Sequence, residues 1–344
     1  MGAGRDRAEE IRRFIVERVS RHPRDVARLV AEQFGLSRQA ANQHLRRLVE
    51  EGVLAADGLT RQRSYRLVTL ASWARSYERT ADLAEDVVWR LDVRPVLGEL
   101  PKNVVDIWQY GVTEMFNNAI EHSGGGAIRV EVRRDAAVTE ITLSDDGVGV
   151  FRKITTALGL LDERHAVLEL AKGKLTTDPV NHTGEGIFFS SRMFDEFTIR
   201  SGGVIFLHRF GEPEDWIAES QEAVTGTTVV MRLGNHTART ASQLFDKYTS
   251  GDDFGFNRTV VPVALARYGD DNLVSRSQAR RLLARVDRFR TVILDFRGVE
   301  EIGQAFADEI FRVYAKRHPE IELRSINAGP NVSRMIARAT VRNG

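Results

Sequence analysis

One stretch of the chain, GVTEMFNNAIEHSGGG at residues 111–126, restricts the possible fold more than any other. Its apolar residues recur at helical spacing and form a face to be buried. Glu114 and Asn118 are four residues apart on another face, which His122 extends by one turn. A helix with one apolar face and one polar row predicts that the polar side lines a site.

Two glycine-containing segments indicate the kind of site. The run EITLSDDGVGV, residues 140–150, alternates like a strand and then breaks at Asp145 into a loop with Gly147 and Gly149. Glycines there let the backbone approach a ligand closely. The run NHTGEGIFFSSRMF, residues 181–194, places Gly184 and Gly186 directly before an apolar helix. Free N–H groups and the helix dipole then face the ligand, so we expect a phosphate cradle.

In the order E-x3-N, D-x-G-x-G, G-x-G and GTTVV (226–230), these motifs resemble the GHKL (Bergerat-fold) superfamily of gyrase-type and histidine-kinase-type ATP-binding domains. The resemblance implies an α/β sandwich that binds ATP and Mg²⁺. It implies that Glu114 orients and deprotonates an attacking water or hydroxyl, and that Asn118 coordinates the metal. The other implied nucleotide contacts are Asp145 at the adenine, Gly147 and Gly149 beside the base, Gly184 and Gly186 at the phosphates, and Thr228 on the strand behind the adenine.

Roles known in the superfamily are less easily assigned to residues between 152 and 183, because the superfamily varies most there. Lys172 and Lys174, in AKGKLTTD, have two interpretations, as lid lysines that neutralise the γ-phosphate or as solvated loop lysines. For His182 the alternatives are a phosphate contact and an ordinary loop residue.

Residues 1–70 are expected to read DNA. Helical patterns at 8–22, 25–35 and 37–52 precede two short strands around a turn at Asp57-Gly58. This order resembles a winged helix-turn-helix domain, in which the third helix enters the major groove and the wing meets phosphate. The segment carries 14 Arg against 9 Asp or Glu, a net charge of +5, whereas the rest of the chain sums to −4. The implied DNA contacts are Arg38, Gln39, Asn42, Gln43, Arg46, Arg61 and Arg63. A packing or protein-docking module is the alternative.

Residues 256–344 alternate between strand and helix patterns, which predicts a small α/β domain, and the turn-rich stretch 236–256 before them is expected to be a linker. The run VILDFRGVEEIGQAFADEIFRVY, residues 292–314, resembles the STAS domains of anti-sigma-factor antagonists and STAS-like domains fused behind GHKL modules. In those antagonists a Ser at the start of the helix accepts phosphate. Here the turn reads EIGQA at 301–305, so we expect docking or packing, with residues 306–309 as a candidate exposed interface.

Length and composition agree with a multidomain α+β protein. The 344 residues exceed one ordinary core, and the expected domains are 1–70, 71–240 and 256–344. The absence of Cys excludes disulfides, thiolate zinc sites and cysteine nucleophiles. No long apolar run is present, so a cytoplasmic location without membrane contact is expected.

The first functional hypothesis is an ATP-binding bacterial transcriptional or signalling regulator, in which ATP and Mg²⁺ in the central domain control DNA binding or partner docking. The alternative is a protein serine kinase like those that inhibit sigma factors, acting on a separate STAS protein. A third hypothesis is a slow ATP-driven clamp. The expected partners are DNA, a STAS or sigma-pathway protein, and a second copy of the chain in a homodimer.

Overall fold

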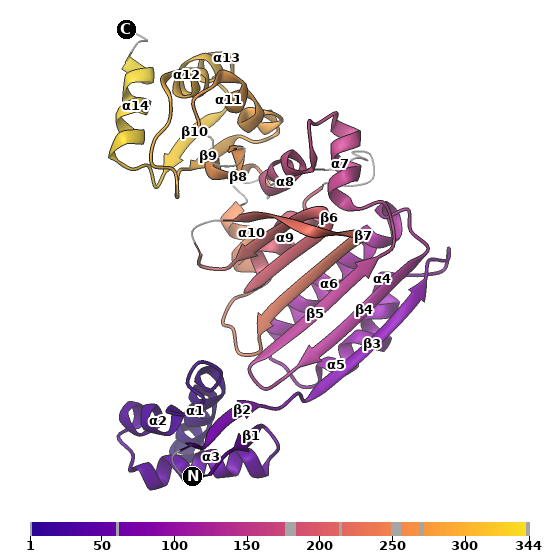
Figure 1. Ribbon diagram of the computed structural model, residues 1–344, viewed down its shortest axis with the longest axis vertical. Coiled ribbons are helices and arrows are strands. Elements are labelled where there is room, and N and C mark those ends of the chain that lie inside the picture. The colour runs from indigo at the N-terminus through magenta and orange to yellow at the C-terminus, as the bar shows by residue number, and fades with distance from the viewer. Residues whose placement is uncertain are drawn as a thin grey trace.

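The computed structural model describes residues 2–59, 62–175, 184–212, 215–248, 256–267 and 272–341. Three domains follow one another along the long axis of the molecule, with the N-terminus near one end and the C-terminus at the other (Figure 1). The expected class, a multidomain α+β protein, is confirmed.

The N-terminal domain has the predicted order of three helices and a hairpin. Ser37 begins the third helix by accepting a hydrogen bond from the backbone N–H of Ala40 at 3.1 Å, and Gly35, with φ of 62°, ends the second. Ile15, Val30 and Leu45 are fully buried in its core. Its elements are α1 (Gly2–Arg18), α2 (Val26–Phe34), α3 (Arg38–Glu50), β1 (Leu54–Asp57) and β2 (Ser64–Leu67).

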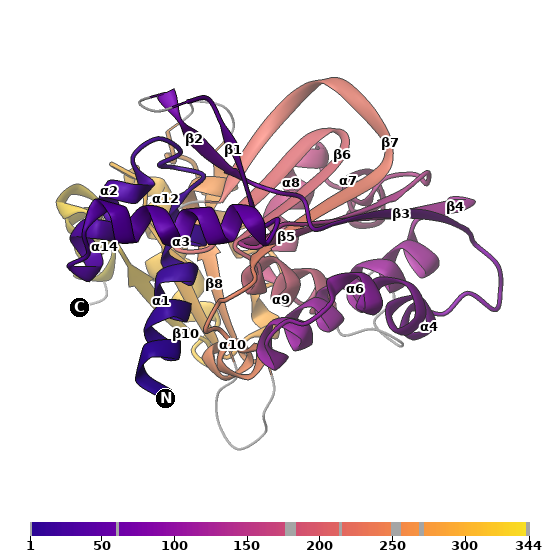
Figure 2. The ribbon, with the colours of Figure 1, turned by 90° about the horizontal axis from the view of Figure 1, so that it is seen from below.

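The central domain is a two-layer sandwich. Its five strands form an antiparallel sheet in the order β3-β4-β5-β7-β6, and helices including α4, α6 and α9 cover one face (Figure 2). The strands are β3 (Ala71–Glu78), β4 (Ala127–Arg134), β5 (Val138–Asp145), β6 (Glu196–Arg209) and β7 (Trp216–Gly234). The helices are α4 (Glu85–Val88), the π-helical turn Trp89–Val93, α5 (Arg94–Leu97), α6 (Lys102–His122), α7 (Val150–Leu158), α8 (Glu163–Lys172), α9 (Gly186–Met193) and α10 (Ala241–Tyr248).

The helix expected around residues 111–122 is the second half of α6. Trp108, Val112 and Phe116 are fully buried against the sheet, and Trp108 lies 4.8 Å from Phe194 between ring centroids. The row with Glu114 and Asn118 is only partly buried, as its polarity predicts.

The expectation of a linker over residues 236–256 is wrong for Ala241–Tyr248, which form α10. Phe245 packs edge-on against Tyr110 of α6 at 5.5 Å and lies 4.7 Å from Phe189 of α9. The turn-like composition of the flanking residues conceals this short amphipathic helix. Therefore α10 packs as part of the central domain.

The C-terminal domain contains the predicted βαβ alternation, with a parallel sheet in the order β10-β9-β8. The first strand of this domain ends at Pro262, which has no N–H to continue the ladder, and Val263–Ala266 form a 3₁₀ turn. The strands are β8 (Arg258–Pro262), β9 (Thr291–Asp295) and β10 (Glu322–Ile326). The helices are α11 (Arg276–Leu283), the 3₁₀ turn Val286–Arg288, α12 (Gln304–Asp308) continued by the π-helical Glu309–Tyr314 and α13 (Ala315–Arg317), and α14 (Pro330–Val341).

Both junctions between domains are packed. Strand β2 leads almost directly into the edge strand β3, and Leu70 N–H donates to Arg134 O at 2.7 Å. The β4–β5 turn places Ala136 and Ala137 against the N-terminal core. On the other side, Phe256 packs at 4.8 Å from Phe188 of α9 and 5.3 Å from Phe289, so the central and C-terminal domains share one hydrophobic cluster.

Candidate nucleotide site

The side chain of Glu114, on α6, reaches the start of α9. A Cβ added to Gly186, the first residue of that helix, would stand 2.0 Å from Glu114 Oε2. Only glycine leaves room for the carboxylate at this point. The structure therefore brings the predicted catalytic carboxylate to the predicted phosphate cradle, from elements 72 residues apart in sequence.

Asp145 lies at the opposite end of the site, where β5 ends. Its Oδ1 accepts hydrogen bonds from Gly147 N–H at 2.9 Å and from Thr227 N–H at 3.3 Å. Burial raises the pKa of this carboxyl, while the two backbone donors oppose the shift. One carboxylate oxygen is thus fixed by the backbone.

The glycines around Asp145 fit so closely that no side chain is tolerated. A Cβ on Gly147 would lie 2.1 Å from Ser123 O, and one on Gly149, with φ of +88°, would lie 2.5 Å from Ser201 Oγ. Gly226 was not predicted as a site residue, yet a Cβ there would stand 1.9 Å from Asp145 O. These three glycines bring the ends of β5 and β7 together around the carboxylate.

The threonine that reaches Asp145 is Thr227, the neighbour of the predicted Thr228. Thr227 donates its N–H to Asp145, and its Oγ1 accepts from Val150 N–H at 3.0 Å. Thr228 pairs with Ser144 across the ladder, and its side chain points to the other face of the sheet. The sequence could have identified Thr227, because the alternation of the apolar residues Val229, Met231 and Leu233 places position 227 on the helix-covered face of the sheet.

Helix α6 spans the site from one end to the other. Glu114 is at the cradle, and Ser123, just after the helix, accepts from Val148 N–H at 2.9 Å in the Asp145 loop. At 1.5 Å per residue these two positions are about 13 Å apart along the axis, which suits an extended nucleoside triphosphate. Asn118 lies between them, and its Nδ2 is buried without a hydrogen-bond partner among the described residues.

Two acidic groups at the cradle were missed from the sequence. Burial raises the pKa of Tyr110 far above its usual range, and the charges of Glu114 and Glu185 add to this shift. Burial also raises the pKa of Glu185, which directly precedes α9, while Lys174 opposes that shift. Glu185 is the middle residue of G-x-G, so its position beside Glu114 was readable only once α6 and α9 were known to meet.

The other cradle glycine, Gly184, lies beside Leu175. Leu175 N–H donates to Gly184 O at 3.1 Å, and a Cβ on Gly184, with φ of +70°, would stand 2.4 Å from Leu175 O. Neither interpretation of Lys172 holds, because its ammonium is buried at the C-terminal domain, as described below. His182 lies outside the described residues.

Three family models match successive parts of the chain. The matched residues are 10–55 for winged helix-turn-helix DNA-binding, 61–206 for the histidine kinase-like ATPase domain and 278–333 for the STAS-like domain of unknown function (DUF4325). The chain combines a winged helix-turn-helix domain, a histidine kinase-like ATPase domain and a STAS-like domain. No curated protein matches the sequence.

In the winged helix-turn-helix domain, the face of α3 away from the core carries the predicted reading residues. Arg38, Gln39, Gln43 and Arg46 are exposed, and Asn42 is half-buried. In the wing, the Arg63 guanidinium stacks over Tyr65 at 5.4 Å instead of extending freely, and Arg61 lies outside the described residues. These contacts to DNA remain predictions.

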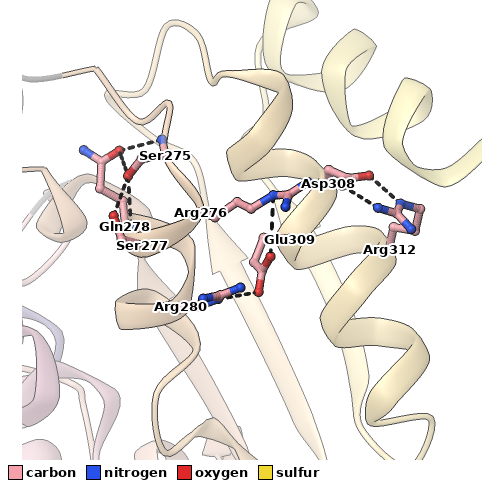
Figure 3. Close-up of polar contacts among 8 residues, drawn as sticks. All are labelled: Ser275, Arg276, Ser277, Gln278, Arg280, Asp308, Glu309 and Arg312. Carbon is pink, nitrogen blue, oxygen red and sulfur yellow. Dashed lines mark hydrogen bonds and ion pairs between the residues drawn. The ribbon is translucent and has the colours of Figure 1, made fainter.

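In the STAS-like domain, the expected exposed face at residues 306–309 is wrong. Phe306 and Ala307 are fully buried because they face α11 and α14, and Asp308 and Glu309 are nearly so. Figure 3 shows that both carboxylates accept hydrogen bonds. Glu309 accepts one from Arg280 Nε at 2.8 Å, and Asp308 accepts one from Arg312. Glu309 thus pairs its helix with α11, whereas the Asp308–Arg312 pair lies within one continuous helix.

The site chemistry fits Mg²⁺ shared with phosphate. Among the described ranges, no three His, Cys, Asp or Glu side chains converge as a protein metal cage. Mg²⁺ commonly takes one or two protein oxygens and completes its shell with phosphate and water. Asn118, the predicted ligand, lies on the row between the cradle and Asp145, and its side chain has an amide oxygen of this kind. No helix within the described residues is long and apolar enough to cross a membrane.

Proposed function

We propose that this chain is an ATP-binding regulator, in which the ATPase domain binds and hydrolyses Mg-ATP and its nucleotide state controls DNA binding by the winged helix. The observation that carries the proposal is the position of Glu114 against Gly186, at the start of α9. A carboxylate there lies where a terminal phosphate would meet the free N–H groups of the helix.

Recognition of the base rests on Asp145. Its carboxylate, fixed by Gly147 and Thr227, would accept the adenine amino hydrogen, and the surrounding glycines let the backbone approach the ring. A hydrogen bond to a charged group contributes roughly 1.5–3 kcal/mol, which corresponds to about ten- to a hundredfold in affinity. This contact alone would separate adenine from bases that present an acceptor at the same place.

Hydrolysis rests on Glu114. Its carboxylate would orient a water molecule towards the terminal phosphate and accept the proton of that water as the new P–O bond forms and the bond from the γ-phosphorus to the leaving ADP oxygen breaks. Mg²⁺, when bound, would neutralise charge on the phosphates, with Asn118 as its protein ligand. The charges of Glu114 and Glu185 both act on Tyr110, so these three groups lie close enough at the cradle to interact electrostatically.

The ATPase domain meets the winged helix through two connections. The wing strand β2 leads into β3, the edge of the ATPase sheet, and Arg13 Nη2 of α1 donates to His236 O, just after β7, at 2.8 Å. Strand β7 also supplies Thr227 to the nucleotide site. A shift of β7 on nucleotide binding would therefore reach the winged helix directly, provided that ATP binds two conformations unequally.

A second candidate is a protein serine kinase that acts on a separate STAS protein. Glu114 would deprotonate a serine hydroxyl as readily as water. The helix start at Gln304 carries no hydroxyl, so the acceptor would belong to another chain. Transfer of labelled γ-phosphate from ATP to a partner protein would favour this candidate over the regulator.

The regulator is tested by DNA selection with the full chain. Duplexes selected from a randomised pool are measured for affinity with Glu114→Gln protein, with and without Mg-ATP, so that nucleotide is bound but not consumed. We expect ATP to change the affinity by at least about fivefold, as is typical of coupled sites. Asp145→Asn/Glu114→Gln protein is the matched control and should show no ATP effect. Equal affinities with and without bound ATP would reject the regulatory coupling.

A further inference from the structure

Lys172, at the end of α8, joins the ATPase domain to the STAS-like domain. Its side chain is 2% exposed, and its Nζ donates to Glu169 Oε1 at 2.8 Å, Arg281 O at 3.0 Å and Ala284 O at 2.9 Å. An ammonium has three N–H donors. All three are used, and two of the acceptors are backbone carbonyls at the end of α11 in the STAS-like domain.

The backbone after Lys172 is held from the same side. Lys172 O accepts from Thr259 Oγ1 of β8 at 2.6 Å. At Gly173, with φ of +81°, a Cβ would stand 2.7 Å from the ring of Phe256. The chain thus passes too close to the aromatic cluster between the domains for any other residue.

Lys174 exchanges hydrogen bonds with the STAS-like domain. Its Nζ donates to Arg288 O at 3.2 Å, and Arg288 Nη1 donates to Lys174 O at 2.8 Å. The ammonium also lies 5.0 Å from the centre of the Phe289 ring. Two contacts in opposite directions fix both the backbone and the side chain of this residue.

The next residue is already part of the phosphate cradle. Leu175 donates its N–H to Gly184 O, and Gly184 precedes Glu185 and the start of α9. Lys174 in addition interacts electrostatically with Glu185. The STAS-like domain is therefore connected to the cradle by one residue of chain and by one charge pair.

We propose that the STAS-like domain positions the phosphate cradle, with Lys172 and Lys174 as positioning residues, so that its docking sets the affinity of the ATPase domain for nucleotide. The proposal rests on the proposed ATP-binding function and adds a role for the third domain. Preorganised cradle N–H groups bind phosphate without first paying for ordering. Removing the contacts of Lys172 and Lys174 with the STAS-like domain should therefore weaken ground-state nucleotide binding more than it slows the chemical step.

Two variants and a control test this inference. Lys172→Met removes the buried ammonium, and Arg288→Ala is the milder variant, since it removes only an exposed donor to Lys174 O. Arg317→Ala, exposed on α13, is the matched control. We expect the Kd for Mg-ATP to rise at least about fivefold in the first two and kcat to stay within about twofold. Glu114→Gln should show the opposite pattern.

Hydrogen exchange in nucleotide-free protein separates this inference from the proposed function. Amides of Leu175 and of residues 184–193 should exchange at least about tenfold faster in both variants than in Arg317→Ala. If wild-type protein binds no ATP, the proposed function fails and the exchange measurement alone decides. Unchanged Kd in two folded variants would overturn the inference, as would unchanged exchange where no nucleotide binds.

Discussion

The carboxylate of Glu114 occupies the space that a side chain at Gly186 would need, with 2.0 Å between Oε2 and an added Cβ. The two residues belong to α6 and α9, whose packing defines the cradle. Because the crowded atom is the end of a flexible side chain, the fold tolerates a methyl group at position 186. The carboxylate, however, would have to move away from the cradle.

Gly186→Ala should therefore fold and lose turnover. The methyl group displaces Glu114 from the cradle, and we expect ATP hydrolysis to fall by at least about tenfold, within the range that a general base contributes. Steady-state ADP release and a thermal melt measure the two effects. Gly203→Ala is the matched control in the same domain, since its Cβ would meet only Ser220 O at 3.8 Å. Wild-type turnover in Gly186→Ala would show that Glu114 does not act from this position.

Nucleotide affinity should fall as the pH becomes mildly acidic. Burial raises the pKa of Asp145, so this carboxyl takes up a proton at a higher pH than an ordinary Asp and then loses its role as acceptor. The same raised pKa makes this group favour the folded state as the pH falls, so its titration should weaken binding without unfolding the domain.

Nucleotide Kd measured across this pH range checks the prediction. Asp146→Asn is the control, because Asp146 accepts from Gly126 and Ala127 N–H and these donors lower its pKa. Its profile should follow wild type, whereas that of Asp145→Asn should be flatter and weaker throughout. Identical profiles for wild type and Asp145→Asn would exclude Asp145 as the titrating group.

The sequence was sufficient for residues whose roles follow from local pattern. Glu114 and Gly186 were each predicted from their own motif, and the structure places them in contact. It was insufficient where a role depends on a partner far along the chain. Lys172 lies in a lysine- and glycine-containing loop pattern that is typical of solvent exposure, and only the docking of residues 281–284 explains its burial. Thr227 falls between these two cases, because the strand alternation predicts that it faces the site, although the GTTVV motif alone does not distinguish it from Thr228.

Removing Lys172 should destabilise the protein. Lys172→Met leaves the buried Glu169 with Arg285, at 3.4 Å, as its one cationic partner among the described residues, and we expect a loss of about 3 kcal/mol in the free energy of unfolding. Lys172→Met/Glu169→Met should recover part of it, because no buried carboxylate is then left poorly paired. Chemical denaturation measures both. Lys316→Met, at an exposed position, should stay within about 0.5 kcal/mol of wild type. A double variant no more stable than the single one would contradict this explanation.

DNA binding should separate base readout from phosphate contact. Gln43→Ala, on the exposed face of α3, should lose about 1–3 kcal/mol of discrimination at one base position. Arg63→Ala should weaken binding to all sequences alike and reduce the salt slope by about 1. Affinities on selected and scrambled duplexes at several salt concentrations measure both, with Gln33→Ala on α2 as the control. A loss of discrimination in Gln33→Ala equal to that in Gln43→Ala would place the reading surface elsewhere.

The most direct test of the ATP-binding function is Mg²⁺-dependent nucleotide binding and ADP release, measured together on wild type, Glu114→Gln and Asp145→Asn. We predict that wild type binds and turns over ATP, that Glu114→Gln binds without turning over, and that Asp145→Asn binds about ten- to a hundredfold more weakly. Wild-type protein that binds no nucleotide, or two variants that match wild type in both measurements, would contradict it.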